Sequence, residues 1–227
     1  DKIIAISDHA EEQLIARYGF NDDDVYRIPH GVNIDRFYPR EERHPAVNPE
    51  KKTVLYVGRL GARKGVDLVL RAIAHLDNPE VEFLIAGTGR YEEYLRSLAA
   101  ELEIENQIQF LGYVPSEDLP QLYSSSNVFV LPSKYEGFGL VVLEAAACGT
   151  QVIGTNAGGI PTAIELTDCG SVVERTPKGF SQAIIRASSE SQAKEDRTSG
   201  TKSHSLPRWS DVCESVENVY RRITAAT

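Results

Sequence analysis

The chain of 227 residues has no methionine, one tryptophan and three cysteines. No apolar run approaches the roughly 20 residues that cross a bilayer, and the start lacks the basic and long apolar segments of a signal peptide. Cys148, Cys169 and Cys213 form no C-x-x-C pair, so they indicate neither a metal site nor a disulfide framework. We therefore expect an intracellular, cytoplasmic protein without a membrane span.

Basic residues are the minority among the charged side chains. The 24 Lys and Arg residues stand against 33 Asp and Glu residues, which gives a formal net charge of −9. Such a surface repels nucleic acids and anionic lipids, so binding to DNA or RNA is not expected. The 41% of hydrophobic residues suffices for a sizeable core. The opening on a charged residue and a strand-like run suggests a piece of a longer protein.

Short apolar runs alternate with helical patterns from residue 52 onward. The run at 52–58 precedes a segment in which Val66, Val69 and Ile73 recur at helical spacing. Further apolar runs lie at 81–87, 107–112, 127–132, 151–155 and 170–174. Apolar strands separated by helices are typical of a parallel sheet covered on both faces. The sequence therefore predicts an α/β fold with a doubly wound parallel sheet, whose ligands bind at the carboxyl ends of the strands.

Four parts are predicted along the chain. Residues 1–49 hold a strand, a helix with Asp8 as its N-cap, and a proline-containing linker. Residues 50–188 form the doubly wound domain. Residues 189–207 are polar and are expected to be a mobile linker. Residues 208–227 form a last helix whose apolar stripe has no evident partner, so we expect it to dock on a missing domain.

The segment 133–150 carries the sharpest chemical signal. A strand ends, a glycine-containing turn carries Glu136, and a helix begins near Gly139 with Glu144 in its early turns. Free backbone N–H groups at a helix N-terminus suit phosphate, and Gly137 and Gly139 let a ligand approach the main chain closely. The plainer alternative is an ordinary turn in which Glu144 only stabilises the start of the helix.

The two carboxylates also raise the possibility of a glycosidase pair. That mechanism needs carboxyl groups about 5 to 9.5 Å apart, whereas eight residues on a helical path span roughly 12 Å. A loop could shorten this path, so the argument weakens the idea without excluding it. A division of labour, in which each carboxylate accepts hydrogen bonds from a different sugar of one ligand, fits better.

The turn at 58–65 contributes cations to the same edge of the sheet. Its glycines lack the spacing of dinucleotide-binding and P-loop motifs. Arg59 and Lys64 instead place two positive charges that can neutralise a pyrophosphate. Gly58 in this turn and Gly87 after the next strand are weaker candidates for binding the same ligand. Two solvated surface cations are the alternative interpretation.

Five motifs together resemble glycosyltransferase family 4. They are HGV at 30–32, GRL followed by KG at 58–65, AGTG at 86–89, LGYV at 111–114, and E-x7-E at 136–144. That family has the GT-B fold, in which two Rossmann-like domains enclose a cleft and the C-terminal domain binds the nucleotide-sugar donor. The chain resembles this C-terminal half plus the last strand and helix of the N-terminal half. The half that binds the acceptor is absent.

The resemblance implies a retaining hexosyltransferase that uses a UDP-, GDP- or ADP-sugar and needs no metal or other cofactor. The acceptor is a glycan or a lipid-linked molecule and binds through the missing N-terminal domain. The fragment alone is expected to be inactive. The full-length enzyme acts in polysaccharide or glycolipid biosynthesis, in the cytoplasm or peripherally at the cytoplasmic face of a membrane.

Individual roles follow from the resemblance, position by position. Arg59 and Lys64 hold the donor diphosphate, and Glu144 accepts hydrogen bonds from the ribose. Glu136 contacts hydroxyls of the transferred sugar, and Val114 lies against the base. The assisting groups belong to the turn and the helix start: Gly137 and the backbone N–H groups of Phe138, Gly139 and Leu140. Because charge develops on the leaving phosphate, Arg59 and Lys64 act as electrostatic catalysts and form the catalytic set together with Glu136.

Three residues depart from the family pattern: Arg63, Gln151 and Thr162. Thr162 stands where the family usually has a cleft-facing Glu, which would alter donor choice or signal relaxed function. A non-catalytic nucleotide-sugar-binding module is therefore an alternative. Another is a GT-B nucleotide-sugar epimerase, for which Glu136 and His30 are the available acid and base.

Two further segments are weighed against plainer interpretations. His30 either faces the cleft or caps the linker. The acidic run at 21–25 has the D-x-D pattern of metal-dependent glycosyltransferases but lies in a linker-like turn. We interpret it as a solvated acidic turn and predict no metal site.

Overall fold

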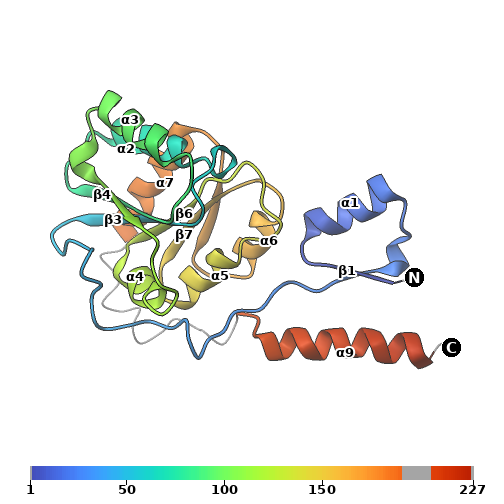
Figure 1. The fold of residues 1–227 in the computed structure, drawn as a ribbon. Coiled ribbons are helices and arrows are strands. Elements are labelled where there is room, and N and C mark those ends of the chain that lie inside the picture. The colour runs from blue at the N-terminus through green and yellow to red at the C-terminus, as the bar shows by residue number, and fades with distance from the viewer. Residues whose placement is uncertain (1, 191–205, 226–227) are drawn as a thin grey trace.

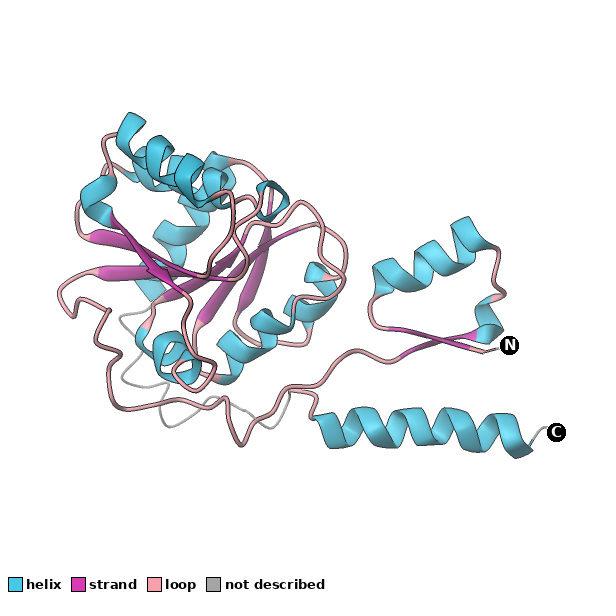
Figure 2. Cartoon of the chain, viewed as in Figure 1, coloured by secondary structure: helices cyan, strands magenta, loops and turns pink. Residues whose placement is uncertain are grey.

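The computed structural model describes residues 2–190 and 206–225. A six-stranded sheet in the order β5-β4-β3-β6-β7-β8 forms the centre of the larger body (Figures 1 and 2). The strands are β3 (Lys52–Val57), β4 (Val81–Ala86), β5 (Ile108–Gly112), β6 (Val128–Leu131), β7 (Gln151–Thr155) and β8 (Gly170–Val173). All neighbouring strands are parallel, which confirms the predicted α/β fold.

Helices cover both faces of this sheet. One face carries α2 (Val66–Leu76), α3 (Glu92–Glu101) and α7 (Pro177–Glu190), and the other carries α4 (Leu119–Ser125), α5 (Leu140–Ala147) and α6 (Ile160–Glu165). Successive residues of β3 alternate between the two cores, with Val54 and Tyr56 in the first and Leu55 in the second. Because both cores are apolar, central strands such as β4 are buried along their whole length.

A smaller unit precedes the sheet and lies beside the larger body (Figure 1). It contains β1 (Ile3–Ala5), α1 (Asp8–Tyr18), the 3₁₀ turn η1 (Asp22–Asp24) and β2 (Val25–Arg27), and β1 and β2 pair in parallel. Strand β2 lies where the sequence predicted only a linker. The predicted N-cap is also wrong, because Ser7 caps α1 by accepting the Ala10 N–H at 3.2 Å, and Asp8 is the first helical residue.

The last helix, α9 (Trp209–Ala225), extends along the smaller unit in Figure 1. Its start is fixed to the linker, since the Val32 N–H donates to the Pro207 carbonyl at 2.9 Å. Val219 on the predicted apolar stripe is buried, and Val212 and Val216 are half-buried. The stripe is therefore partly covered within this chain. Apart from its two ends, the predicted polar segment 189–207 lies outside the described residues.

Two short 3₁₀ turns complete the described elements, η2 (Ala62–Lys64) and η3 (Glu105–Gln107). No helix in the two described ranges has both the length and the hydrophobicity that crossing a bilayer requires. Strand β3 pairs with β4 on one side and with β6 on the other. The chain therefore reverses its direction of winding between β3 and β6, and such a point opens a crevice at the carboxyl ends of the strands.

Candidate functional site

Two loops meet at this crevice, one after β3 (residues 58–65) and one after β6 (residues 132–139). The Lys134 N–H donates to the Arg63 carbonyl at 2.7 Å. A Cβ at Gly65 would lie 2.2 Å from the Pro132 carbonyl oxygen, so only glycine allows this approach. The contacts fix the two predicted segments against one another.

Lys64 and Glu136 form an ion pair between these loops. The Lys64 Nζ lies 2.5 Å from Glu136 Oε2, and the two side chains are 17% and 22% exposed. The Ser133 hydroxyl donates to the same carboxylate oxygen at 3.3 Å. The structure thus brings together two of the three predicted catalytic residues, although the sequence assigned them to different groups of the ligand.

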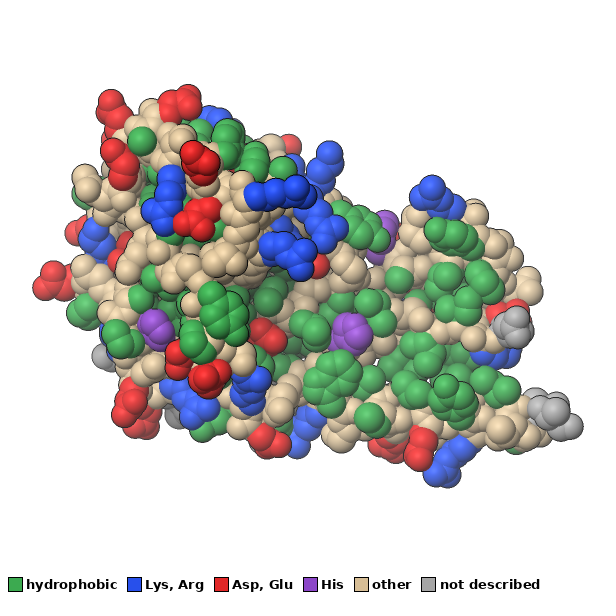
Figure 3. Space-filling view, in the orientation of Figure 1, with side chains coloured by type: hydrophobic (Ala, Val, Ile, Leu, Met, Phe, Trp, Pro, Cys, Tyr) green, Lys and Arg blue, Asp and Glu red, His purple; other side chains and the backbone are tan. Residues whose placement is uncertain are grey.

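Arg59 lies on the rim of a hollow of about 690 Å³. The hollow is also lined by Arg63, Lys64 and Arg90. Within the described parts of the chain, none of the three arginines forms an ion pair. Figure 3 shows Lys and Arg side chains gathered along the edge of the larger body that faces the smaller unit. On a chain of net charge −9, this is a local cationic surface suited to phosphate.

Tyr56 supports the turn that carries Arg59. Its hydroxyl donates to the Arg59 carbonyl at 3.0 Å, and its ring is fully buried. Burial, assisted by the negative charge of Glu136, raises the pKa of Tyr56 well above its usual value. The phenol therefore stays protonated and remains a donor to the turn.

Glu144 is half-buried beside the second core. The hydroxyl of the buried Tyr123 donates to its Oε2 at 3.2 Å. Burial raises the pKa of Glu144, while the Tyr123 hydrogen bond and the charge of Arg36 act in the opposite direction. A half-buried carboxylate that keeps one partner can accept further hydrogen bonds from a ligand hydroxyl.

The predicted glycines have close neighbours. A Cβ at Gly87 would lie 1.9 Å from the Gly58 carbonyl oxygen, so β3 and β4 end in direct backbone contact. The Gly87 N–H continues this contact to β5 by donating to the Gly112 carbonyl at 2.6 Å. Val114, two residues further, is half-buried against the second core. The ends of β3, β4 and β5 thus form one backbone platform beside the hollow.

At the start of α5, the backbone rather than the side chains is presented to the crevice. Gly139 adopts a left-handed conformation (φ 94°), and no side chain caps the helix. Phe138 is buried with its ring 5.2 Å from that of His30, whereas Gly137 and Leu140 are exposed. Because the Phe138 ring is buried, the role implied for this residue falls to its main chain.

Thr162 does not face an open cleft. Its side chain is 4% exposed, and its hydroxyl donates to Asp8 Oδ2 at 2.8 Å and lies 3.2 Å from the Asp8 N–H that it accepts. Beside it, the Ser7 hydroxyl donates to the Gly137 carbonyl at 3.3 Å. The Glu136 carbonyl accepts the Gly159 N–H at 2.9 Å. The start of α1, the region of α6 and the carboxylate loop therefore form one hydrogen-bonded assembly.

The two ambiguous segments have structural roles. The His30 ring lies 5.5 Å from that of Trp209 as well as next to Phe138, and burial lowers its pKa. It contacts aromatic rings, while Glu136 pairs with Lys64. Asp24, from the acidic run, forms an ion pair with Lys2 at 2.7 Å.

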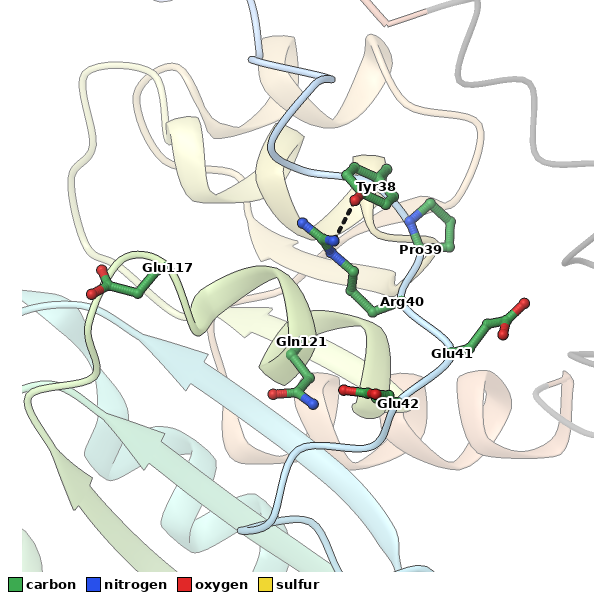
Figure 4. A pocket seen from close by; sticks show the side chains of 7 residues that line it. All are labelled: Tyr38, Pro39, Arg40, Glu41, Glu42, Glu117 and Gln121. Atoms are coloured by element: carbon green, nitrogen blue, oxygen red, sulfur yellow. Dashed lines mark hydrogen bonds between the residues drawn. The ribbon is translucent and has the colours of Figure 1, made fainter.

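A second hollow, of about 560 Å³, lies between the linker and the start of α4 (Figure 4). In Figure 4, Arg40 turns toward Tyr38 and hydrogen-bonds to its hydroxyl, while Glu41 points away. Glu42, Glu117 and the amide of Gln121 also line this space. None of the predicted site residues borders it, so we do not assign the site there.

The sequence-based predictions missed the partners that hold the site residues. Tyr56, Tyr123 and Ser133 support Arg59, Glu144 and Glu136, respectively. The sequence offered one signal for these partners, which is the polar hydroxyl group of tyrosine. A tyrosine inside an apolar strand or a core-facing helix needs a hydrogen-bond partner. Nothing in the sequence named the partner.

Comparison with known proteins shows the family to which the chain belongs. The family described as glycosyl transferases group 1 matches residues 38–204. This match covers more than half of the chain, which therefore belongs to that family. A glycosyltransferase of uncharacterised specificity from Methanocaldococcus jannaschii is 30% identical over 97% of this chain and 60% of its own length.

Solved structures show the GT-B fold. Sucrose-phosphate synthase from Thermosynechococcus elongatus superposes with a TM-score of 0.85 at 29% identity, over all of this chain and 59% of that one. HepE from Anabaena, solved in complex with UDP, superposes with a TM-score of 0.79 at 21% identity, over 99% of this chain and 64% of that one. The chain thus spans less than two thirds of the length of these relatives.

Proposed function

We propose that the chain is the donor-binding, C-terminal half of a family 4 retaining glycosyltransferase, which transfers a hexosyl group from a UDP-, GDP- or ADP-sugar to a glycan or lipid-linked acceptor. The observation that carries this proposal is the meeting of Lys64, Glu136 and the cationic hollow at the point where the sheet reverses its winding. The UDP held by Anabaena HepE, which has the same fold, supports a nucleotide donor.

Each group of the donor has a proposed partner. Arg59 and Lys64 take the diphosphate, since Arg59 forms no ion pair with any residue that the structure describes and Lys64 lies at the same hollow. Glu144 accepts hydrogen bonds from the ribose, and Glu136 from the transferred sugar. The base lies against Val114, on the platform that Gly58 and Gly87 form.

The proposed chemistry needs no protein nucleophile. As the bond between the sugar and the phosphate breaks, negative charge collects on the diphosphate. The two cations and the uncapped start of α5, with the N–H groups of Phe138, Gly139 and Leu140, stabilise that charge. The leaving phosphate oxygen accepts the acceptor's proton, and the acceptor attacks from the same face, which retains configuration. These groups supply the positive charge that a metal ion would otherwise provide.

The acceptor is proposed to bind in a domain outside this chain. The chain spans about three fifths of the length of these two relatives. Part of their cleft therefore has no counterpart here. Residues 50–188 then form the donor domain, and the partly covered stripe of α9 docks on the other half.

We further propose a cytoplasmic site of action, with the full-length enzyme at a membrane surface when its acceptor is a lipid. The alternative of a non-catalytic module rests on the missing half and on Thr162. Because Thr162 hydrogen-bonds to Asp8, only the missing half still supports this alternative.

A thermal-shift panel tests the donor site directly. UDP, GDP and ADP, each with and without a sugar, are added to the chain in the presence and in the absence of a chelator. A ligand at about 100 times its dissociation constant stabilises by about 2.7 kcal/mol, which raises the melting temperature by roughly 5–10 °C for a domain of this size. We expect one base to give this shift, and Arg59→Ala or Glu144→Ala to abolish it.

The matched control is Arg17→Ala, which removes an exposed arginine on α1 far from the hollow and leaves the shift unchanged. If none of the nucleotides shifts a folded chain, the proposed donor site is wrong. A shift that disappears with the chelator contradicts metal independence alone.

A further inference from the structure

The ion pair between Lys64 and Glu136 joins two groups that the proposed function assigns to different parts of the donor. Lys64 is proposed to serve the diphosphate and Glu136 the sugar, yet the two groups lie 2.5 Å apart. We propose that Glu136 makes the site selective for nucleotide sugars over free nucleoside diphosphates, because it competes with the diphosphate for Lys64 unless sugar hydroxyls take the place of the ammonium group. This inference rests on the proposed function.

The loops around the pair leave little freedom to relax. Lys64 follows a turn whose carbonyl at Arg63 is bonded to Lys134, and Gly65 abuts Pro132. On the other side, the Glu136 carbonyl accepts the Gly159 N–H, and a Cβ at Gly158 would lie 2.0 Å from that same carbonyl oxygen. The two backbones are therefore held in position, so a ligand must break the pair through side-chain movement rather than by separating the loops.

Burial sets the strength of the competition. Both side chains are about four-fifths covered, so the ion pair is screened less than one on the open surface. A free nucleoside diphosphate would take Lys64 and leave the Glu136 carboxylate with the Ser133 hydroxyl as its remaining partner. An unpaired, largely covered charge is unfavourable. With a nucleotide sugar, the diphosphate takes Lys64 while hydroxyl donors of the sugar satisfy Glu136.

The same competition would act after transfer. Once the sugar has left, Glu136 loses its hydroxyl partners and recovers Lys64, which favours departure of the nucleoside diphosphate. The pair therefore distinguishes the nucleotide sugar, which is the substrate, from the nucleoside diphosphate, which is the product. The presence of the sugar decides whether Glu136 pairs with Lys64.

Isothermal titration of the chain with a nucleoside diphosphate and with its nucleotide sugar measures this selectivity. Glu136→Gln keeps the shape of the side chain and removes its charge. We expect Glu136→Gln to tighten binding of the free diphosphate by about threefold, because the variant no longer has an ion pair that competes for Lys64. We expect it to weaken binding of the nucleotide sugar by about tenfold, as for loss of charged hydrogen bonds.

Two further variants separate competition from other effects. Glu136→Asp keeps a negative charge near the phosphates but shortens its reach toward Lys64, so a gain in diphosphate affinity that persists in this variant supports competition. A gain restricted to Glu136→Gln reflects general repulsion and overturns the proposal. Asp24→Asn breaks a comparable carboxylate–lysine pair, with Lys2, remote from the site and should leave both affinities unchanged.

The outcomes also separate this inference from the proposed function. If the wild-type chain binds neither ligand, the donor site itself is wrong. If it binds both and Glu136→Gln leaves the ratio of the two affinities unchanged, the donor site stands and the selectivity proposal is overturned. Melting temperatures of the variants confirm that folded chains are compared.

Discussion

At the scale of single residues, Glu144 is held in a position that opposes its own ionisation. Its half-buried carboxylate accepts a hydrogen bond from the Tyr123 hydroxyl, and burial raises its pKa. A raised carboxylate pKa favours the folded state below the pKa of the unfolded chain. That contribution is lost as pH rises through the pKa of the folded chain. At neutral pH, the ionised Glu144 therefore lowers the free energy of unfolding.

Replacing Glu144 by Gln should stabilise the chain and weaken ligand binding. Glutamine has nearly the same shape without the charge, so we expect the free energy of unfolding at pH 7 to rise by about 1 kcal/mol, as for other partly buried functional groups. At about pH 4 the protonated wild-type side chain resembles glutamine, and the difference should shrink. Urea denaturation at the two pH values measures both effects.

The control for this prediction is Glu101→Gln, at the exposed end of α3, which should change stability little at either pH. A larger gain for Glu144→Gln at pH 4 than at pH 7 would reverse the sign and contradict the argument. The nucleotide affinity of the same variant shows whether the stability is gained at the expense of binding.

Site residues could be predicted where a local pattern marked them. Arg59, Lys64 and Glu136 each lie in a glycine-containing turn directly after a strand, and such turns meet at one edge of a parallel sheet. The environment of Glu144 could not be predicted, because Tyr123 lies on another helix. The contact of Thr162 with Asp8 joins residues 154 positions apart. Local patterns contain no information about pairs so distant in the sequence.

At the scale of elements, the start of α1 is fixed to α6 and to the carboxylate loop. Asp8 pairs with Arg27 of β2 and shares two hydrogen bonds with Thr162, while Ser7 reaches the Gly137 carbonyl. The smaller unit is thus attached to the sugar-binding side of the proposed site by polar groups that are mostly covered.

A double-mutant cycle tests this attachment. Thr162→Val keeps the volume but removes the hydroxyl that binds the Asp8 N–H and Oδ2, while Oδ1 keeps its pair with Arg27, so we expect a loss of about 1 kcal/mol in the free energy of unfolding. Asp8→Asn weakens the same contact from the other side. The double variant should lose less than the sum of the single losses, with a coupling of at least about 0.5 kcal/mol. Strict additivity would show that the contact contributes nothing.

Element prediction succeeded where hydrophobic patterns were long and failed where they were short. The six core strands and the helices α2, α3, α5 and α7 follow from their apolar runs. Strand β2 has three residues, and its pairing with β1 supplies the hydrogen bonds that define it. Helix α6 has six residues and begins with Ile160 and Pro161 after two glycines, a composition that locally favours a turn.

At the scale of the whole molecule, binding and transfer should be separable. The chain holds the proposed donor site, whereas we propose that the acceptor is positioned by the part of the relatives that the chain does not span. Correct positioning can contribute about 7–11 kcal/mol to a bimolecular reaction. We therefore expect the chain to bind its nucleotide but to transfer sugar at a rate at least about a thousandfold below that of the full-length protein.

A radiolabelled donor and a panel of glycan and lipid acceptors measure this difference, with hydrolysis of the donor scored separately. Transfer by the chain alone at the full-length rate would show that the acceptor site lies within residues 1–227. Absence of transfer from the full-length protein as well would instead contradict the proposed activity.

The pairing of β3 with β6 also has a consequence for how the chain folds. Val54 and Val128 pair directly, yet β4, β5, three α-helices and two 3₁₀ turns lie between them in the sequence. Contacts so distant along the chain close late, because a large loop must first be ordered. The loops carrying Lys64 and Glu136 extend from these two strands, so they come together only when this central pairing forms. We expect a nucleotide that bridges the two loops to slow unfolding more than it speeds folding, since its site is incomplete until the last part of the sheet has closed.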